Sequence, residues 1–264
     1  MELEIYPPIL NNENFNSSAF HTEYFNNTKM VGDYRKFIMD DKLKSTPYTI
    51  IPITNDVKDR VVNFLRKFFF RDEPLNMAVG LLDEPNANCT ELEEYCLACI
   101  PNGMSIMAVS PSGYILGMCL NEIKIRDQKE NNDSKINDEC ANPKCKKILQ
   151  LLATMNKCSD VFGHFPTAEK LLEIVILSVD ESCRGQGICK TLVEKTKEMA
   201  IQKNFPLIKV DCTSHFSAKA VSRLGFHCIY TISYMDYVDS EGNRVFKTKS
   251  PHSSAKTFVL PLNV

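Results

Sequence analysis

The sequence predicts an α/β fold with a mixed, mostly antiparallel sheet and helices on both of its faces. From residue 48 onward, short apolar runs typical of strands alternate with longer segments of helical apolar spacing. Two of the runs, MSIMAVS and YILGMCLNEI, flank Ser-Pro-Ser-Gly, which is typical of an antiparallel hairpin. Another run, EIVILSV at 173–179, has the continuous apolar character of a strand buried on both faces and leads through glycines into a helix.

Composition indicates a single globular domain with a short additional segment. The 264 residues are 44% hydrophobic and 24% charged, which is enough apolar material for one full core. A net charge of -2 gives no field that would gather nucleic acid or anionic lipid, so neither is an expected partner. MELEIYPPIL has no basic and apolar leader pattern, and no apolar run is long enough to cross a bilayer, so we expect a cytoplasmic protein. Its eleven cysteines are an odd number and indicate reduced thiols.

The N-terminal region divides into an extension and the start of the domain. The first segment is rich in asparagine and has no sustained periodicity, so we expect residues 1–45 to be poorly ordered and the domain to cover 46–264. YTIIPI predicts a strand, and TNDVKDRVVNFLRKFFF then places cap residues before apolar positions at helical spacing. Thr90 and Glu93 match the capping box and predict a short helix through Leu97.

The second half of the domain contains an insertion and then regular elements. The charged, asparagine-rich stretch 127–142 predicts an exposed insertion, and Pro143 stands where a helix over 143–158 would begin. After the 173–179 strand we expect a helix, a strand, a helix and two closing strands, over 183–203, 207–212, 217–226, 228–238 and 255–262.

The turn after the 173–179 strand has the chemistry of a phosphate site. It reads Arg184, Gly185, Gln186, Gly187, Ile188 and Cys189. Free N–H groups at a helix N-terminus point outward, the helix dipole favours an anion there, and glycine allows close backbone approach. No GKS or GKT follows the glycines and no GxGxxG is present, so this is neither a Walker loop nor a Rossmann fingerprint. A diphosphate suits the turn, and the alternative is an ordinary strand-to-helix connection.

The same turn resembles the acetyl-CoA motif of the GNAT acetyltransferases, which is Gln/Arg-x-x-Gly-x-Gly/Ala after the fourth strand. Arg184, Gly187 and Cys189 occupy its three positions, and Cys189 departs from the small residue expected there. FFFRDEPLN, ILSVDESCRGQGI and CTSHFSAKAVSRLGF also occur in the order and separation typical of insect arylalkylamine N-acetyltransferases. The likeness extends from residue 48 to about 261 and leaves the N-terminal segment uncovered.

The resemblance implies a GNAT fold, in which the sheet is splayed between its fourth and fifth strands and the acetyl-pantetheine arm inserts there. It implies acetyl-CoA as co-substrate and no metal. The expected contacts of acetyl-CoA are the backbone of a bulge in the fourth strand, the turn after it and one hydroxyl: Leu177, Ser178, Val179, Arg184, Gly185, Gln186, Gly187, Ile188, Cys189 and Ser217. Amides of the bulge would also stabilise the oxyanion that forms on the thioester.

The resemblance further implies acetylation of a small arylalkylamine of the dopamine, serotonin, octopamine, tyramine and tryptamine class, by direct transfer in a ternary complex. An alkylammonium with a pKa of about 10 is less than ~0.1% neutral at pH 7, so a base must remove a proton first. By resemblance that base is Glu73, with Asp72 beside it. Thr213 and Ser217 are the hydroxyls that would reprotonate the CoA thiolate.

The residues themselves leave other roles open. Glu73 beside a proline is also typical of a solvated carboxylate at a helix end. Ser217 also fits the N-cap of the helix that follows it, and Thr213 fits an ordinary loop hydroxyl. His215 suits a structural or cofactor-contacting loop residue better than a base.

Two further motifs have structural alternatives. The three phenylalanines at 68–70 either pack in the core or line an acceptor site, where they would favour an aryl substrate. Cys96 and Cys99 form a CxxC without a second pair at zinc spacing, so we expect no metal site.

Other functions remain open at this point. A GNAT enzyme could acetylate polyamines or other non-aromatic amines, and a GNAT fold could bind acetyl-CoA without catalysis. Acetylation of proteins is a third alternative, although the chain has no additional reader module. We expect a monomer whose partners are acetyl-CoA and a small amine.

Overall fold

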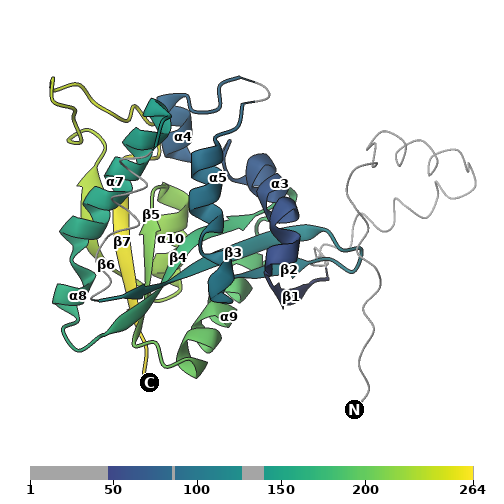
Figure 1. Cartoon of the computed structure of the whole chain (residues 1–264). Helices are drawn as coiled ribbons and strands as arrows, with labels where there is room; N and C mark the ends of the chain where they lie inside the picture. Colours follow the sequence, from purple (N-terminus) through teal and green to yellow (C-terminus); the bar gives the residue numbers. More distant parts are fainter. Residues whose placement is uncertain (1–46, 85–86, 127–139, 264) are drawn as a thin grey trace, which may run out of the picture.

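The computed structural model describes residues 47–84, 87–126 and 140–263. The predicted extension 1–45 and positions 127–139 of the predicted insertion therefore lie outside the described residues. Within these ranges, strands form one seven-stranded sheet in the order β1-β2-β3-β4-β5-β7-β6, as Figure 1 shows. The strands are β1 (Thr49–Pro52), β2 (Ile106–Val109), β3 (Ile115–Ile125), β4 (Lys170–Val179), β5 (Leu207–Cys212), β6 (His227–Ser233) and β7 (Ser254–Pro261).

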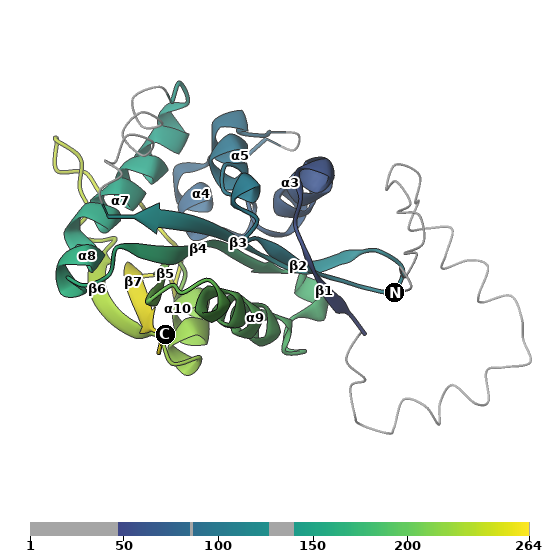
Figure 2. The same cartoon turned by 60° about the horizontal axis from the view of Figure 1, so that its bottom comes forward.

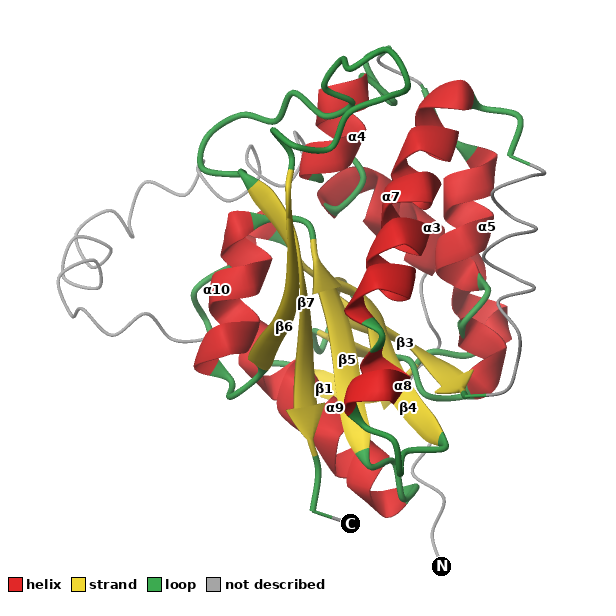
Figure 3. Cartoon of the chain, turned by 90° about the vertical axis from the view of Figure 1, so that its left-hand side faces the viewer, coloured by secondary structure: helices red, strands yellow, loops and turns green. Residues whose placement is uncertain are grey.

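Helices cover both faces of this sheet, as predicted. The α-helices of the described chain are α3 (Lys58–Phe68), α4 (Pro74–Val79), α5 (Thr90–Leu97), α7 (Pro143–Ser159), α8 (Val161–His164), α9 (Ile188–Gln202) and α10 (His215–Arg223). Figures 2 and 3 show α3, α5 and α7 on one face and α9 and α10 on the other. Only β4 and β5 pair in parallel, and the other neighbouring strands are antiparallel. The mixed, mostly antiparallel α/β fold is thereby confirmed.

The sheet is splayed between β4 and β5. The two strands pair only from Leu172–Ile174 on β4 to Ile208–Val210 on β5. Beyond this point β4 remains paired with β3 alone in the described part of the chain, so no described strand pairs with the other side of its backbone edge from Val175 to Val179. Two parallel strands separated in this way leave an opening in the middle of the sheet.

The bulge in β4 lies earlier than predicted. Leu120 and Asn121 of β3 stand opposite Ile176 and Ile174, so Val175 is the extra residue of the pair. We expected the bulge near residues 177–179, and that position is wrong. The sequence there is an unbroken apolar run, and register in such a run depends on the partner strand rather than on local residues.

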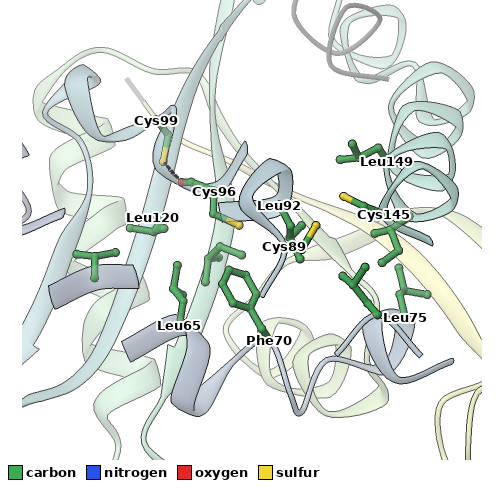
Figure 4. Packing of buried hydrophobic residues seen from close by; sticks show 14 of the residues in the cluster. Leu65, Phe70, Leu75, Cys89, Leu92, Cys96, Cys99, Leu120, Cys145 and Leu149 are labelled. Carbon is green, nitrogen blue, oxygen red and sulfur yellow. Dashed lines mark hydrogen bonds between the residues drawn. The ribbon is translucent and has the colours of Figure 1, made fainter. Parts of the chain in front are cut away.

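Two hydrophobic clusters stabilise the layers. Figure 4 shows Leu65, Leu92 and Leu149, from α3, α5 and α7, gathered in the cluster on one face of the sheet. Leu192 of α9 and Val221 of α10 belong to the cluster on the other face. All five side chains are buried, and burial of each contributes about 1.5–3 kcal/mol relative to an exposed position. The opening between β4 and β5 is thus framed by two packed layers.

Helix starts differ from the predictions where side chains find other partners. The capping box at Thr90 does not form, because Cys89 is the N-cap and no side chain caps the helix. Glu93 instead accepts two hydrogen bonds from the Arg66 guanidinium, at 2.7 and 2.8 Å. By contrast, Asn142 caps α7 as its side chain accepts from two backbone N–H groups, and Pro143 is the first helical residue as predicted.

Two features near the site differ from the predictions: α4 was not predicted, and β6 ends earlier than expected. Helix α4 is too short for an apolar period to show in the sequence, and it ends at Gly80, which adopts a φ of 64°. The strand expected over 228–238 ends at Ser233, and the chain then turns, with the Tyr234 N–H bonded to the Ser253 carbonyl at 3.0 Å. The first feature places Glu73 at the start of α4, and the second places Tyr234 directly after β6.

Candidate active site

The glycine turn after β4 has room for a diphosphate. Gly185 and Gly187 adopt φ values of 81° and 85°, and a Cβ built on either would meet nothing within 4 Å. Gly187 is the N-cap of α9, whose first-turn N–H groups lack intrahelical partners. Arg184 reaches back, and its Nε donates to the Val179 carbonyl at 3.3 Å. Open space, free amides and a guanidinium therefore meet at one place, which suits the phosphates of acetyl-CoA.

A cavity of about 750 Å³ continues from this turn into the opening between β4 and β5. The predicted backbone contacts Leu177, Ser178 and Val179 line it, together with Ser217. The extended β4 edge at residues 175–179 has no partner strand within the ranges that the structure describes, and it can pair with amides of an extended ligand. The structure thus places the predicted strand residues, part of the turn and the Ser217 hydroxyl around one cavity.

The wall on the α7 side of the cavity is aromatic and aliphatic. Phe68 and Phe69 line it at the end of α3, Tyr95 lines it from α5, and Leu149 and Leu152 line it from α7. Phe70, in contrast, is buried in the core. Of the three neighbouring phenylalanines, two therefore contact the cavity and one packs in the core.

Glu73 lies in this cavity and is buried. It is the N-cap of α4, and its Oε2 accepts a hydrogen bond from the Asn76 N–H at 2.7 Å. Only 8% of the residue is exposed, and its Oε1 is buried without a hydrogen-bond partner among the described residues. Burial raises the pKa of the carboxyl, while the Asn76 N–H and the Thr213 hydroxyl oppose the rise. The alternative of a solvated carboxylate is wrong, because the fold buries this side chain.

Asp72, the neighbour of Glu73, points to another partner. Its Oδ2 lies 3.0 Å from Nη2 of Arg184, so an ion pair joins the loop before α4 to the glycine turn. Both side chains are about half exposed, at 55% and 53%, and an exposed pair of this kind contributes little stability. Arg184 therefore has contacts on both sides of the cavity mouth.

The segment after β5 contains the two hydroxyl residues that were predicted for the site, Thr213 and Ser217. Ser214, not Ser217, is the N-cap of α10, because its Oγ accepts from the Ser217 N–H at 3.0 Å. Ser217 lies within the first turn, and its hydroxyl donates to the Ser214 carbonyl at 3.0 Å. Thr213 lines the cavity beside Glu73, and its carbonyl accepts a hydrogen bond of 2.6 Å from Tyr234. The capping role predicted for Ser217 belongs to the serine three residues earlier.

Aromatic rings stand at the mouth of the cavity. Phe216 is 64% exposed and packs edge-on against both His215 and His252. The His215 backbone N–H donates to Nδ1 of His252 at 3.2 Å. These contacts agree with a structural role for His215, and no hydrogen bond joins its ring to Glu73 among the described residues.

A charged cluster that sequence reasoning missed lies at the inner end of the cavity. Lys209 Nζ is 2.7 Å from Glu173 and 2.9 Å from Asp211, and we call these three residues the charged floor. Each side chain is at most 13% exposed, and all three line the cavity. The available signal was a charged residue at the start of EIVILSV and two charged residues that alternate with apolar ones in LIKVDC, which we interpreted only as strands.

The cysteines form no site of their own. All eleven are free thiols. Cys99 donates to the Cys96 carbonyl at 3.3 Å, the contact dashed in Figure 4. In the described ranges, no group of three or more histidine, cysteine or acidic side chains could hold a metal ion. No helix in these ranges is long and apolar enough to cross a membrane.

Comparison with known proteins adds independent evidence. Residues 83–226 match the sequence profile of the acetyltransferase (GNAT) family. The chain is similar to arylalkylamine N-acetyltransferase 2 from Aedes aegypti, with 36% identity and a TM-score of 0.77 over 82% of this chain and 99% of that one. It is also similar to a Drosophila melanogaster polyamine N-acetyltransferase that catalyses formation of N-acetylagmatine (27% identity, TM-score 0.73, 82% and 100% covered). An agmatine N-acetyltransferase is similar at 26% identity, with a TM-score of 0.72 over 81% and 99%.

Proposed function

This chain belongs to the GNAT acetyltransferase family and is an acyltransferase, and on that basis we propose that it acetylates the primary amine of small arylalkylamines. The observation that carries the proposal is the position of Glu73. Its buried carboxyl lines a cavity whose α7-side wall is made of aromatic and aliphatic side chains. Such a wall favours an aryl ring, and a carboxylate at its end favours an alkylammonium.

Acetyl-CoA supplies the activated acetyl group as a thioester. The residues that would hold it are the glycine turn with Arg184, the open edge of β4 and the hydroxyl of Ser217. Amide N–H groups along the open edge of β4 would donate to the carbonyl oxygen of the thioester, where negative charge develops. This charge is then stabilised by groups that the fold has already oriented.

Glu73 would remove the proton from the amine. An alkylammonium of pKa about 10 is almost entirely protonated at neutral pH and cannot attack until a base accepts the proton. Burial raises the pKa of Glu73, which makes its carboxylate a stronger base than an exposed glutamate. Its Oε1, without a partner among the described residues, is the atom that would accept the proton, directly or through water.

A hydroxyl would return a proton to the departing CoA thiolate. Thr213 and Ser217 both line the cavity on the β5 side of the opening. The hydroxyl of Ser217 donates its single hydrogen to the Ser214 carbonyl, so it would have to rotate out of this bond to protonate the thiolate. Thr213 lies beside Glu73 and is the alternative donor.

A polyamine or agmatine acceptor is the second candidate. The chain is similar to enzymes of that description at 27% and 26% identity, and two carboxylates line the inner end of the cavity. The higher identity to an arylalkylamine enzyme and the aromatic wall support our first choice.

The proposal is tested by thiol release from acetyl-CoA with phenethylamine, tyramine, agmatine, spermidine and a lysine peptide. We expect turnover of the arylalkylamines, and a rate at neutral pH that falls about 10²- to 10³-fold in Glu73→Gln. An exposed control, Glu94→Gln, should retain the full rate. Turnover of agmatine and spermidine alone would overturn the substrate class, and acetyl-CoA binding without any turnover would indicate a binding protein.

A further inference from the structure

The cavity extends along α7 between two polar ends. The start of α7 packs against α4, the helix that Glu73 caps, and residues of both helices line the cavity. Leu149 belongs to the apolar wall, and Asn156 follows about 10 Å further along the helix. Asn156 Oδ1 lies 3.3 Å from the ammonium of the charged floor. The lining therefore changes from a carboxyl through an apolar wall to a charged end.

Residues on the β5 side of the cavity are arranged in the same order. Thr213, beside Glu73, and Asp211 of the charged floor both line the cavity. They are two residues apart, which is about 7 Å along a strand. An arylethylamine with its amine at Glu73 can reach this far with a substituent on its ring.

The charged floor has spare hydrogen-bond acceptors and no spare donor on its lysine. Lys209 Nζ contacts Glu173, Asp211 and Asn156, which accounts for its three hydrogens. Asp211 Oδ1 also accepts from the Thr257 hydroxyl at 2.6 Å. Each carboxylate has about four lone-pair sites, so acceptor capacity remains on both. A ligand hydroxyl that reaches this end can therefore donate a hydrogen bond to a carboxylate oxygen.

The charges at this end oppose one another, with the carboxylates in excess. Lys124 Nζ lies 2.8 Å from Glu122 Oε2 and 3.8 Å from Glu173 Oε2, and the second distance is too long for a hydrogen bond. Lys124 and Lys209 thus partly offset Glu173 and Asp211, and all four line the cavity. Burial acts to lower the pKa of Lys209, but the two carboxylates raise it, so this cation persists at neutral pH. Lys209 therefore weakens the attraction of this end for a second ammonium, which would also lose its hydration here.

From these contacts we propose that the charged floor selects acceptors that carry a hydroxyl group on the end remote from the amine, and that Lys209 weakens binding of a second ammonium there. The hydroxyl would donate to a carboxylate oxygen of Glu173, because Asp211 already accepts from both Lys209 and Thr257. This inference rests on the proposed function, because it requires the amine to be held at Glu73. It makes Glu173 and Lys209 specificity-determining residues with different effects, since one supplies an acceptor and the other supplies an opposing charge.

The test compares kcat/KM for tyramine, phenethylamine and agmatine in the full chain and its variants. In the wild type, tyramine should exceed phenethylamine about tenfold or more, because a hydrogen bond to a charged acceptor is lost with the hydroxyl. Glu173→Met should bring this ratio close to one while phenethylamine turnover stays within about threefold. Glu173→Gln, which keeps one acceptor oxygen, should give an intermediate ratio.

Lys209→Met tests the effect of the opposing charge. It removes one of the two cations that offset the carboxylates, so agmatine turnover should rise about tenfold relative to tyramine. Lys195→Met, which changes an exposed lysine on α9, should leave every ratio unchanged. Circular dichroism and acetyl-CoA binding verify that each variant folds. If Lys209→Met does not fold, the tyramine to phenethylamine ratios of Glu173→Met and Glu173→Gln test the inference.

The outcomes separate this inference from the proposed function. Equal turnover of tyramine and phenethylamine in the wild type, or an unchanged ratio in Glu173→Met, overturns the role of the charged floor and leaves arylalkylamine acetylation intact. If neither arylalkylamine reacts while agmatine does, both the proposed function and this inference are wrong.

Discussion

At the scale of a single residue, two effects on the carboxylate of Glu73 oppose each other. One oxygen caps α4, and capping by an anion stabilises a helix start. The other oxygen is buried without a partner among the described residues, and burial of an ionised carboxylate is unfavourable. The raised pKa is the balance of these effects, and it provides a base at a cost in folding free energy.

This conflict predicts a pH-dependent effect of Glu73→Gln on stability. A carboxyl with a higher pKa in the folded state stabilises fully below its ordinary value of 4.5, and that contribution is lost as pH rises through the folded value. The variant should therefore gain free energy of unfolding relative to the wild type between about pH 4.5 and pH 8. Urea unfolding at both pH values measures the difference. A gap that is the same at both ends of this range, as expected for the exposed control Glu94→Gln, would contradict the burial argument.

At the scale of elements, the glycine turn and α9 act as one unit. Both glycines of the turn have positive φ, and the space beside them is open. A side chain at the N-cap would strain the backbone and occupy the space from which an anion reaches the first helix turn. The turn therefore depends on glycine both for its conformation and for access to the amides.

Two glycine substitutions separate these effects. Gly187 and Gly242 have φ values of 85° and 81°, and neither would place a Cβ within 4 Å of another group. Gly187→Ala and Gly242→Ala should each destabilise the fold by about 1–2 kcal/mol. Only Gly187→Ala should weaken acetyl-CoA binding, about tenfold, as isothermal titration calorimetry would show. Equal affinity in the two variants would mean that the turn does not contact the co-substrate.

At the scale of the whole molecule, the site depends on segments that are distant in sequence. The base comes from the start of α4, the apolar wall from α3, α5 and α7, and the charged floor from β4 and β5. β3 lies beside β4 and holds the strand whose other edge is open. The packing of the central strands therefore maintains the opening.

A core substitution on β3 should test this dependence. Leu120 is fully buried in the cluster on the α7 face, whereas Ile125 at the end of the same strand is 42% exposed. Leu120→Ala should cost about 2–5 kcal/mol of unfolding free energy, because it leaves a cavity in the core. Ile125→Ala should cost much less, and thermal or urea unfolding of the two variants compares them. Similar losses in both would show that the core does not depend on β3 in this way.

Local patterns in the sequence determined much of this fold. The span 207–212 was predicted as a strand and is β5 residue for residue, because a short apolar run with charged alternates is a local signal. The start of α7 at Pro143 and the glycine turn before α9 could likewise be predicted from the sequence, since caps and φ preferences act within a few residues. The roles of Glu73, Thr213 and Ser217 came from resemblance alone, and the structure places all three around one cavity.

Only the tertiary structure decided the features that depend on distant partners. The bulge at Val175 follows from register with β3, and the cap at Ser214 depends on where the turn after β5 begins. The burial of Glu73 depends on the packing of α4 against its neighbours. The charged floor exists because β4 and β5 align Glu173 with Lys209. Burial, register and charge pairing are properties of neighbours in space, whereas the sequence by itself determines the order of the elements and the turns that join them.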